Sequence, residues 1–226
     1  MSAPSPGLLR RALVRFGAGA AILATVFFVT AGTLDYWQAW LYMAVLFTPL
    51  TLALIYFYRN DPEFLERRIR SSEPRARQRT VIGASAIILV LAYVLPGLDQ
   101  RFGWSHVPVL VVLAADVVSL LSYLGLLLVL RENRYAARTV EVQAGQRVIT
   151  SGPYRIVRHP MYLAASVMYL AGPLALASYW AVLPALLLPL VLAMRLLDEE
   201  RLLAEELPGY REYQAQTKYR IIPGIW

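Results

Sequence analysis

Long apolar runs separated by arginine-rich loops constrain this chain more than any other feature of its sequence. A helix needs about 20 residues to cross the apolar part of a bilayer, and several runs reach that length. They predict an all-α integral membrane protein. The first crossings are expected near residues 12–34, 36–58, 81–98 and 107–130.

The apolar stretch 161–194 is too long for one straight crossing. Gly172, Pro173 and Pro184 interrupt it, which favours two helices joined by a tight turn near residues 177–180. The prediction is therefore about six transmembrane helices, with the last two forming a helical hairpin.

The positive charges are distributed as this count requires. Of the 22 Lys and Arg residues, all but Arg101 fall in the N-terminal segment, in loops 59–80 and 131–160, or from Arg195 onward. An excess of Lys and Arg marks the cytoplasmic side of a membrane protein. We therefore expect both termini and both large loops to be cytoplasmic.

The composition limits which partners this chain is expected to bind. The net charge of +7 does not indicate nucleic acid, because the basic residues are spread over loops beside the membrane, where anionic lipid headgroups explain them equally well. The absence of cysteine and two histidines far apart argue against a metal site. Loop 59–80 is expected to be a solvated connector on the membrane surface. Arginine outnumbers lysine 21 to 1, which is typical of a bacterial source, so we expect a bacterial cytoplasmic membrane.

The polar stretch 152–162 lies at the mouth of the expected hairpin, where polar groups are costly unless they bind something. Pro160 favours the first turn of a helix and keeps the preceding residue extended, which places His159 at or near the helix N-cap. The three amides after Pro160 would then lack helical partners and attract an anion. Arg158 and His159 would flank that anion site, with Tyr162 able to stack or donate a hydrogen bond.

A second polar cluster follows the hairpin. Arg195 and Glu199 are four residues apart and share one helix face, whereas Glu200 points to a neighbouring face. A helix end emerging into water would also explain these charges. The hairpin, however, returns this end to the membrane face that carries His159, so the two clusters are expected to meet in one site.

Asp116 and the C-terminal tail are two further polar or interfacial features of the sequence. Asp116 lies inside the fourth expected span, where a charge is costly and usually faces a protein interior or a cavity. Ser119 and Tyr123 lie on nearby faces and could donate hydrogen bonds to its carboxylate. The tail Tyr219–Trp226 has the composition of an interfacial anchor that could also cover the site.

The C-terminal half carries four motifs: Val148-Ile-Thr-Ser-Gly-Pro-Tyr154, Arg158-His-Pro-Met-Tyr162, Glu199-Glu200 and the Tyr210/Tyr213 tail. Together they resemble the isoprenylcysteine carboxyl methyltransferase family, which is related to integral-membrane phospholipid methyltransferases. The resemblance covers roughly residues 130–226. It implies that residues 131–226 form a methyltransferase-like catalytic region, which follows the four-helix transmembrane region, residues 1–130, expected from the apolar runs. The second region would contain a cytoplasmic cofactor-binding loop, the hairpin and a C-terminal interfacial helix.

By this resemblance the cofactor is S-adenosylmethionine, held between the loop and the hairpin. The family arginine that faces the substrate falls on Arg195. Glu199, one helical turn later, is the second candidate catalytic residue because its carboxylate could act as a base. The implied cofactor-binding residues begin with a strand before the Gly-x-Tyr turn and are Arg147, Val148, Ile149, Tyr154, His159, Pro160, Met161, Tyr162 and Glu199. Arg158, beside the expected anion site, and Glu200, beside Glu199, are expected to bind the cofactor as well, because of their own charge.

The chemistry of these residues suits that cofactor. Its ammonium group suits Glu199 or Glu200, and its sulfonium suits an aromatic face such as Tyr154. A lipophilic acceptor is expected, either a small molecule or a lipid, and an isoprenylcysteine-like carboxylate would be oriented by Arg195 without any base. An amine acceptor, as in a phospholipid N-methyltransferase, would need a base, for which Glu199 or Glu200 is the candidate.

Two functions of other classes stay open at this point. A membrane reductase using NADPH would want more basic residues around the pocket than the paired glutamates provide. A non-enzymatic transporter would need polar groups deep in the bundle, and Asp116 is the one ionisable residue expected there.

Overall fold

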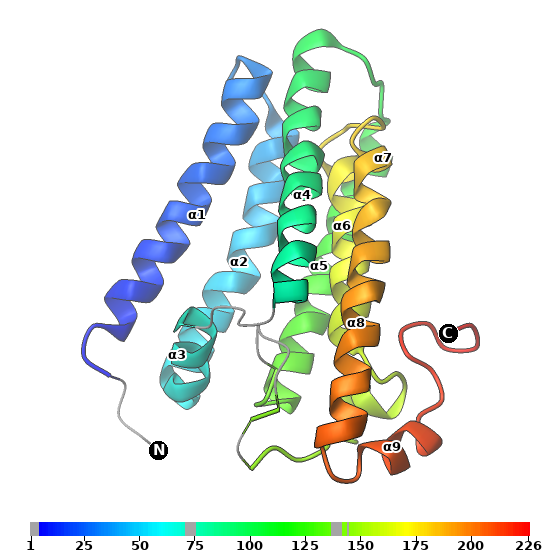
Figure 1. Ribbon diagram of the computed structural model, residues 1–226. Helices are drawn as coiled ribbons and strands as arrows, with labels where there is room; N and C mark the ends of the chain where they lie inside the picture. Colours follow the sequence, from blue (N-terminus) through cyan, green and yellow to red (C-terminus); the bar gives the residue numbers. More distant parts are fainter. Residues whose placement is uncertain (1–4, 71–75, 137–141, 144) are drawn as a thin grey trace.

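The computed structural model describes residues 5–70, 76–136, 142–143 and 145–226. These residues form a bundle of helices (Figure 1), and none of them lies in a strand. The all-α architecture predicted from the sequence is confirmed.

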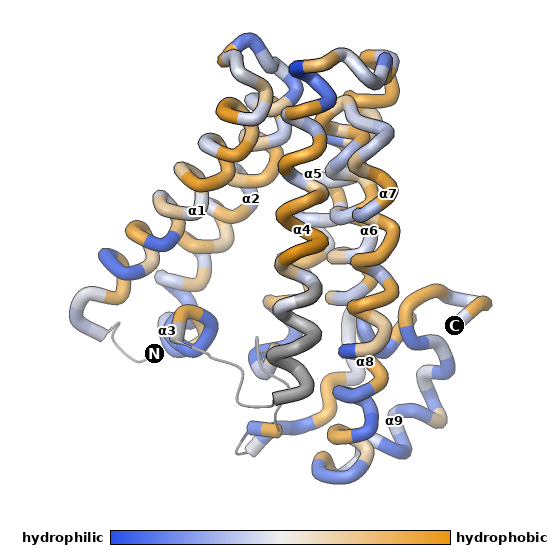
Figure 2. Tube along the Cα trace, turned by 45° about the horizontal axis from the view of Figure 1, so that its top comes forward, coloured by the Kyte–Doolittle hydropathy of each residue, from blue (hydrophilic) through white to orange (hydrophobic). Residues whose placement is uncertain are grey.

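Four helices are long and apolar enough to cross a membrane. Their bounds are α1 (Leu8–Ala31), α2 (Trp37–Asn60), α4 (Ala76–Phe102) and α5 (Val109–Glu132). Apolar residues occupy much of the length of the long helices, and hydrophilic residues gather toward the ends of the bundle (Figure 2). The protein is therefore an integral membrane protein.

The remaining described elements are shorter or more polar. They are α3 (Pro62–Arg70), the 3-10 turn η1 (Gly152–Arg155), α6 (Pro160–Ala175), α7 (Val182–Ala185), α8 (Leu187–Glu206) and α9 (Tyr210–Gln216). Helix α6 has only 16 residues, and the second half of α8 is charged. Six crossings therefore stay a prediction.

Helix α3 was not expected, because its segment was predicted to be a solvated connector. Asp61 explains where it begins, since its Oδ1 accepts a hydrogen bond from the amide of Phe64 at 3.1 Å and Pro62 follows in the first helical position. An aspartate cap followed by proline is a strong helix start. Residues 71–75 of the predicted connector lie outside the described residues.

The long helices alternate in direction (Figure 1). Helices α1, α4 and α6 run one way, and α2, α5 and α8 run the other. The start of α1, the start of α6 and the end of α8 consequently lie at the same end of the bundle, where α9 also lies.

A buried carboxylate holds the turn between α6 and α8 at the opposite end. Asp99, only 2% exposed, accepts hydrogen bonds from the hydroxyl of Ser178 at 2.5 Å and from the hydroxyl and the amide of Ser105, both at 2.6 Å. Nearby, the hydroxyl of Tyr36 donates to the carbonyl of Leu176 at 2.6 Å. These bonds tie the turn to α4 and the start of α2, so α8 is directed back along the bundle.

Asp116 faces the protein interior as predicted, but neither Ser119 nor Tyr123 donates a hydrogen bond to it. Asp116 and Ser119 are buried, at 4% and 0% exposed. Among the described residues, neither carboxylate oxygen of Asp116 nor the hydroxyl of Ser119 has a hydrogen-bond partner. Tyr123 instead belongs to a group of tyrosines with Tyr42 and Tyr93. Helical spacing placed these groups on nearby faces but could not give the direction of each side chain.

Gly97 allows α1 and α4 to approach closely, as small residues do in membrane helix pairs. A Cβ at Gly97 would overlap Oγ1 of Thr30 and lie 3.0 Å from the carbonyl oxygen of Phe27. Oγ1 of Thr30 is itself held by a 2.6 Å hydrogen bond to the carbonyl of Val26. We expect Gly97→Ala to destabilise the protein by about 1–3 kcal/mol, measured as a lower unfolding midpoint in detergent.

Gly83→Ala is the matched control, because it lies on the same helix and a Cβ there meets nothing within 4 Å. Alanine at a helical glycine without steric conflict stabilises by about 0.5–1 kcal/mol. Equal midpoints for the two variants would contradict the close approach at Gly97.

Candidate active site

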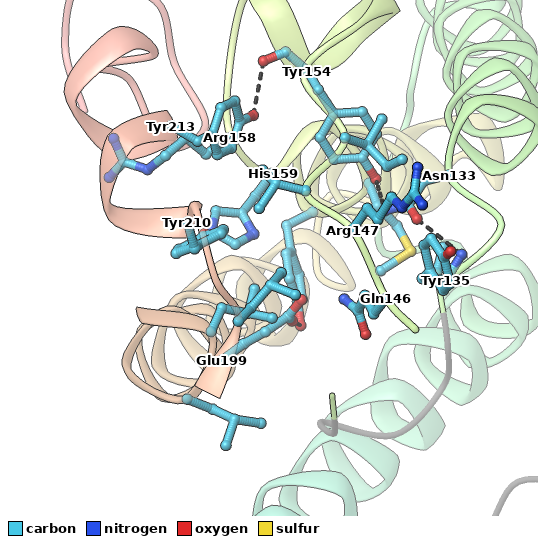
Figure 3. Close-up of a pocket in the computed structure, with 18 of the residues that line it drawn as sticks. Asn133, Tyr135, Gln146, Arg147, Tyr154, Arg158, His159, Glu199, Tyr210 and Tyr213 are labelled. Atoms are coloured by element: carbon cyan, nitrogen blue, oxygen red, sulfur yellow. Dashed lines mark hydrogen bonds between the residues drawn. The ribbon is translucent and has the colours of Figure 1, made fainter. Parts of the chain in front are cut away.

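A pocket of about 260 Å³ lies at the end of the bundle where α6 begins and α8 ends (Figure 3). Its lining comes from the end of α3, the loop after α5, η1, the start of α6, α8 from Leu192 onward, and α9. Arg195 and nine of the eleven predicted cofactor-binding residues line it, the nine being Arg147, Val148, Ile149, Tyr154, Arg158, His159, Met161, Tyr162 and Glu199. Pro160 and Glu200 are absent from its described lining.

The His-Pro corner has the backbone geometry that the sequence predicts. Helix α6 begins at Pro160, and His159 is its N-cap with φ −127°. The amides of Arg158 and His159 donate to the carbonyls of Tyr219 and Arg220, both at 2.9 Å. The corner is thus bound to the C-terminal tail through the backbone.

The predicted anion site at the start of α6 was wrong in part. The amides of Tyr162 and Leu163 both donate to the carbonyl of His159, at 3.1 and 3.2 Å. An N-cap carbonyl that accepts the first helical bonds leaves those amides unavailable to a ligand. The start of α6 therefore offers side chains, rather than a row of free amides, to the pocket.

Glu200 lies at the centre of a buried charge network instead of facing the pocket. Its Oε1 accepts from Nε of Arg158 at 2.6 Å and lies 3.2 Å from Nε2 of His159, and its Oε2 accepts from Nε of Arg220 at 2.8 Å. Burial by itself would raise the pKa of Glu200, but the hydrogen bonds from His159, Arg158 and Arg220 outweigh it and lower the pKa to about 2. Glu200 is therefore a charged anchor with both oxygens engaged.

Arg158 binds the C-terminal tail from the same network. Its Nη1 donates to the carbonyls of Thr217 and Lys218, each at 2.8 Å. The tail continues into a turn in which the amides of Arg220, Ile221 and Ile222 donate to the terminal residue Trp226 at 3.0 Å. The segment after α9 is not helical, so the predicted C-terminal helix is limited to α9.

Glu199 faces the pocket, one residue before Glu200. Its Oε2 accepts a 2.6 Å hydrogen bond from the hydroxyl of Tyr162. Arg195, one helical turn earlier on α8, also interacts with that hydroxyl. The shared face predicted for Arg195 and Glu199 thus brings both to Tyr162 at the pocket.

Tyrosines form another wall of the pocket. Asn133 donates to the hydroxyl of Tyr154 at 2.9 Å, and the hydroxyl of Tyr213 donates to the backbone carbonyl of Tyr154 at 2.8 Å. Burial raises the pKa of Tyr154 above its ordinary range and that of Tyr213 to about 12, so both rings stay neutral. Tyr210 packs beside Tyr213, with ring centroids 5.8 Å apart.

Some lining residues were missed by sequence reasoning, among them Asn133, Tyr135 and Gln146. Tyr210 and Tyr213 belong to the motifs that resemble the family, but the sequence did not predict that they line the site. Their spacing of three places both on one face of α9, which is the signal that could have identified them. Asn133 directly follows the last residue of α5, and no sequence spacing relates it to the other residues of the site.

The loop before η1 is irregular rather than extended in strands. Val142, Val148 and Ile149 pack by their side chains against a cluster that includes Tyr154 and Tyr210, and no described residue of the loop lies in a strand. The strand implied before the Gly-x-Tyr turn was therefore wrong.

Gly152 allows the turn into η1. Its φ of +56° suits glycine, and a Cβ there would lie 3.1 Å from the side chain of Glu132. Ser151 also hydrogen-bonds to Glu132 through its hydroxyl. The loop is thus joined to the end of α5, which positions Tyr154 at the pocket.

The sequence also matches a known protein family. The sequence model of the phospholipid methyltransferases matches residues 117–208, from the middle of α5 through α8. This segment is similar to the integral-membrane methyltransferases, which include the phospholipid and isoprenylcysteine carboxyl methyltransferases. The resemblance seen in the motifs is confirmed, although the match begins earlier than residue 130 and ends before the tail. Comparison with curated proteins found no match.

Proposed function

We propose that this protein transfers a methyl group from S-adenosylmethionine to a lipophilic acceptor that enters the site from the bilayer. One observation carries the proposal: two polar clusters far apart in sequence line the same pocket, His159 and Tyr162 from α6 with Arg195 and Glu199 from α8. The match of residues 117–208 to the phospholipid methyltransferases supports methyl transfer as the type of reaction.

The proposed topology has six crossings, with α6 and α8 as the fifth and sixth. The arginine-rich loops and the pocket lie at one end of the bundle, and the excess of arginine assigns that end to the cytoplasm. Both termini are then cytoplasmic, and the cofactor reaches the pocket from the cytosol.

The side chains at the pocket fit the charged groups of the cofactor. S-adenosylmethionine supplies a methyl group activated by a sulfonium. Glu199 offers a carboxylate to an ammonium group, and the neutral rings of Tyr154 and Tyr210 offer aromatic faces to a cation. Methyl transfer by displacement needs alignment and the exclusion of water more than acid–base chemistry.

A carboxylate is the acceptor group that these residues suit best. It is already ionised and needs no base, and Arg195 can orient it through its planar fork. Glu200 is a poor base because both of its oxygens are engaged by cations and its pKa is lowered to about 2. Transfer to an amine would leave Glu199 as the base.

Calorimetric titration with S-adenosylhomocysteine tests the proposal. We expect the purified wild-type protein to bind it with a single site. Incubation with a labelled methyl donor and a total lipid extract should then yield a labelled lipid, which identifies the acceptor. A wild-type protein that is folded but binds no S-adenosylhomocysteine would refute the assignment.

His159→Ala is expected to weaken binding of S-adenosylhomocysteine at least about tenfold, because the ring lines the pocket and contacts Glu200 and Tyr210. His106→Ala is the matched control, since His106 is exposed at the opposite end of the bundle. The unfolding midpoints of both variants should be recorded in parallel. Equal affinities for the two variants would exclude His159 from cofactor binding.

A further inference from the structure

Two adjoining hollows lie between α2 and α5, apart from the candidate active site. One has a volume of about 390 Å³ and the other about 550 Å³. Tyr56, Phe57 and Arg131 line both of them, so the two hollows meet at these side chains. Together they are called here the α2–α5 groove.

The first hollow is apolar and belongs to membrane-spanning helices. Leu124, Leu127 and Leu128 line it from α5, a spacing that forms one stripe along a helix. Leu52 and Ala53 line it from α2. Leu52 and Leu128 are each 55% exposed, so the groove opens toward the surrounding lipid.

The second hollow lies where these helices end and carries charges of both signs. Its two cations are Arg131 and Arg134, and its two carboxylates are Asp61 and Glu63. Arg134 and Asp61 are joined in a 3.0 Å ion pair. Within the described part of the chain, Arg131 and Glu63 form no ion pair, and Arg131 instead lies over the ring of Tyr56, 5.2 Å from its centroid.

We propose that the α2–α5 groove binds one phospholipid with a zwitterionic headgroup. An acyl chain occupies the apolar hollow between the leucines. Arg131 contacts the phosphate, and Glu63 contacts the ammonium. Since Asp61 is neutralised by Arg134, the groove has one cation, Arg131, and one anion, Glu63, available among its described residues. This arrangement matches a zwitterion better than an anionic headgroup, which Glu63 would repel.

This groove is separated from the active site by an apolar wall. Phe57 and Leu130 contact the groove, Met161 and Ala136 contact the active-site pocket, and all four pack in one cluster. The lipid bound there is therefore distinct from a methyl acceptor. The proposal does not depend on the methyltransferase assignment, because its readout is bound lipid rather than activity.

Native mass spectrometry of the detergent-solubilised protein tests the groove with mixed micelles of equal phosphatidylcholine and phosphatidylglycerol. Phosphatidylcholine is the suitable zwitterion, because its fully methylated ammonium cannot accept another methyl group. We expect the wild-type protein to retain one phosphatidylcholine. Leu128→Trp, which fills the apolar hollow from an exposed position, should lower that retention at least about tenfold.

Leu121→Trp is the matched control, because Leu121 is two turns earlier on the same face of α5, is 62% exposed and lies outside the described lining of the hollow. It should retain lipid as the wild type does. Glu63→Gln should shift the preference toward phosphatidylglycerol. Equal retention by the two tryptophan variants, or a wild-type preference for phosphatidylglycerol that Glu63→Gln leaves unchanged, would overturn the proposal.

Discussion

Replacing Arg195 by alanine is expected to lower kcat/KM for methyl transfer at least about 10²-fold. Arg195 lines the pocket beside Tyr162 and Glu199, where a carboxylate acceptor would need a cation to hold it in line. Removing that cation costs orientation and charge pairing of the acceptor, but leaves the groups proposed to hold the cofactor. Affinity for S-adenosylhomocysteine should therefore change little.

Two variants make this result specific. Met194→Ala changes the neighbouring residue, which is 54% exposed, and should keep wild-type turnover. Arg195→Lys keeps the charge but loses the planar fork, so it should fall between wild type and alanine. If Arg195→Ala lowers cofactor affinity as much as it lowers kcat/KM, Arg195 belongs to cofactor binding and the proposed acceptor role is wrong.

Glu200→Ala is expected to destabilise the protein by about 3–5 kcal/mol, because it leaves a buried arginine without its counter-ion. Arg158 is only 7% exposed and Glu200 only 5%. The same change releases Arg220 and with it one attachment of the C-terminal tail. A lower unfolding midpoint in detergent and faster proteolysis after residue 216 are the measurements.

Glu205→Ala is the control for this prediction. Glu205 lies on the same helix but is exposed, and surface substitutions usually change stability by less than about 0.5 kcal/mol. Glu200→Gln keeps an oxygen acceptor without the charge and should be intermediate. Similar midpoints for the Glu200 and Glu205 alanine variants would mean that the network contributes little to stability.

The same network makes stability depend on acid. The pKa of Glu200 is lowered from 4.5 to about 2 in the folded protein, so its contribution is fully present above pH 4.5 and is lost as the pH falls toward 2. The full difference corresponds to about 3 kcal/mol. The wild-type midpoint should therefore fall more steeply than that of Glu200→Gln as the pH is lowered below about 4.5.

Much of the fold followed from local sequence. The apolar runs predicted α1, α2, α4 and α5, since length and composition decide whether a helix can cross a membrane. The start of α6 at Pro160 followed from the steric preferences of proline. Helix α3 was missed because a short cap at Asp61 lay within a strongly charged segment that resembled a connector.

The candidate site was predicted less completely. Helical spacing brought Arg195 and Glu199 to the same face correctly, and the hairpin brought them toward Tyr162. Helical spacing could not predict that Arg158 and Arg220 would donate hydrogen bonds to both carboxylate oxygens of Glu200. Those contacts join positions that are 42 and 20 residues apart, so no short-range pattern records them.

The sequence by itself determined the membrane character, the arginine-rich end of the bundle and the family of residues 117–208, because each depends on residue type at nearby positions. Only the tertiary structure decided which of two adjacent glutamates faces the pocket. Neighbouring helical residues differ by about 100° in direction, so Glu199 and Glu200 necessarily face different surroundings. The C-terminal tail packed against the Glu200 side, which made one carboxylate an anchor and left the other at the pocket.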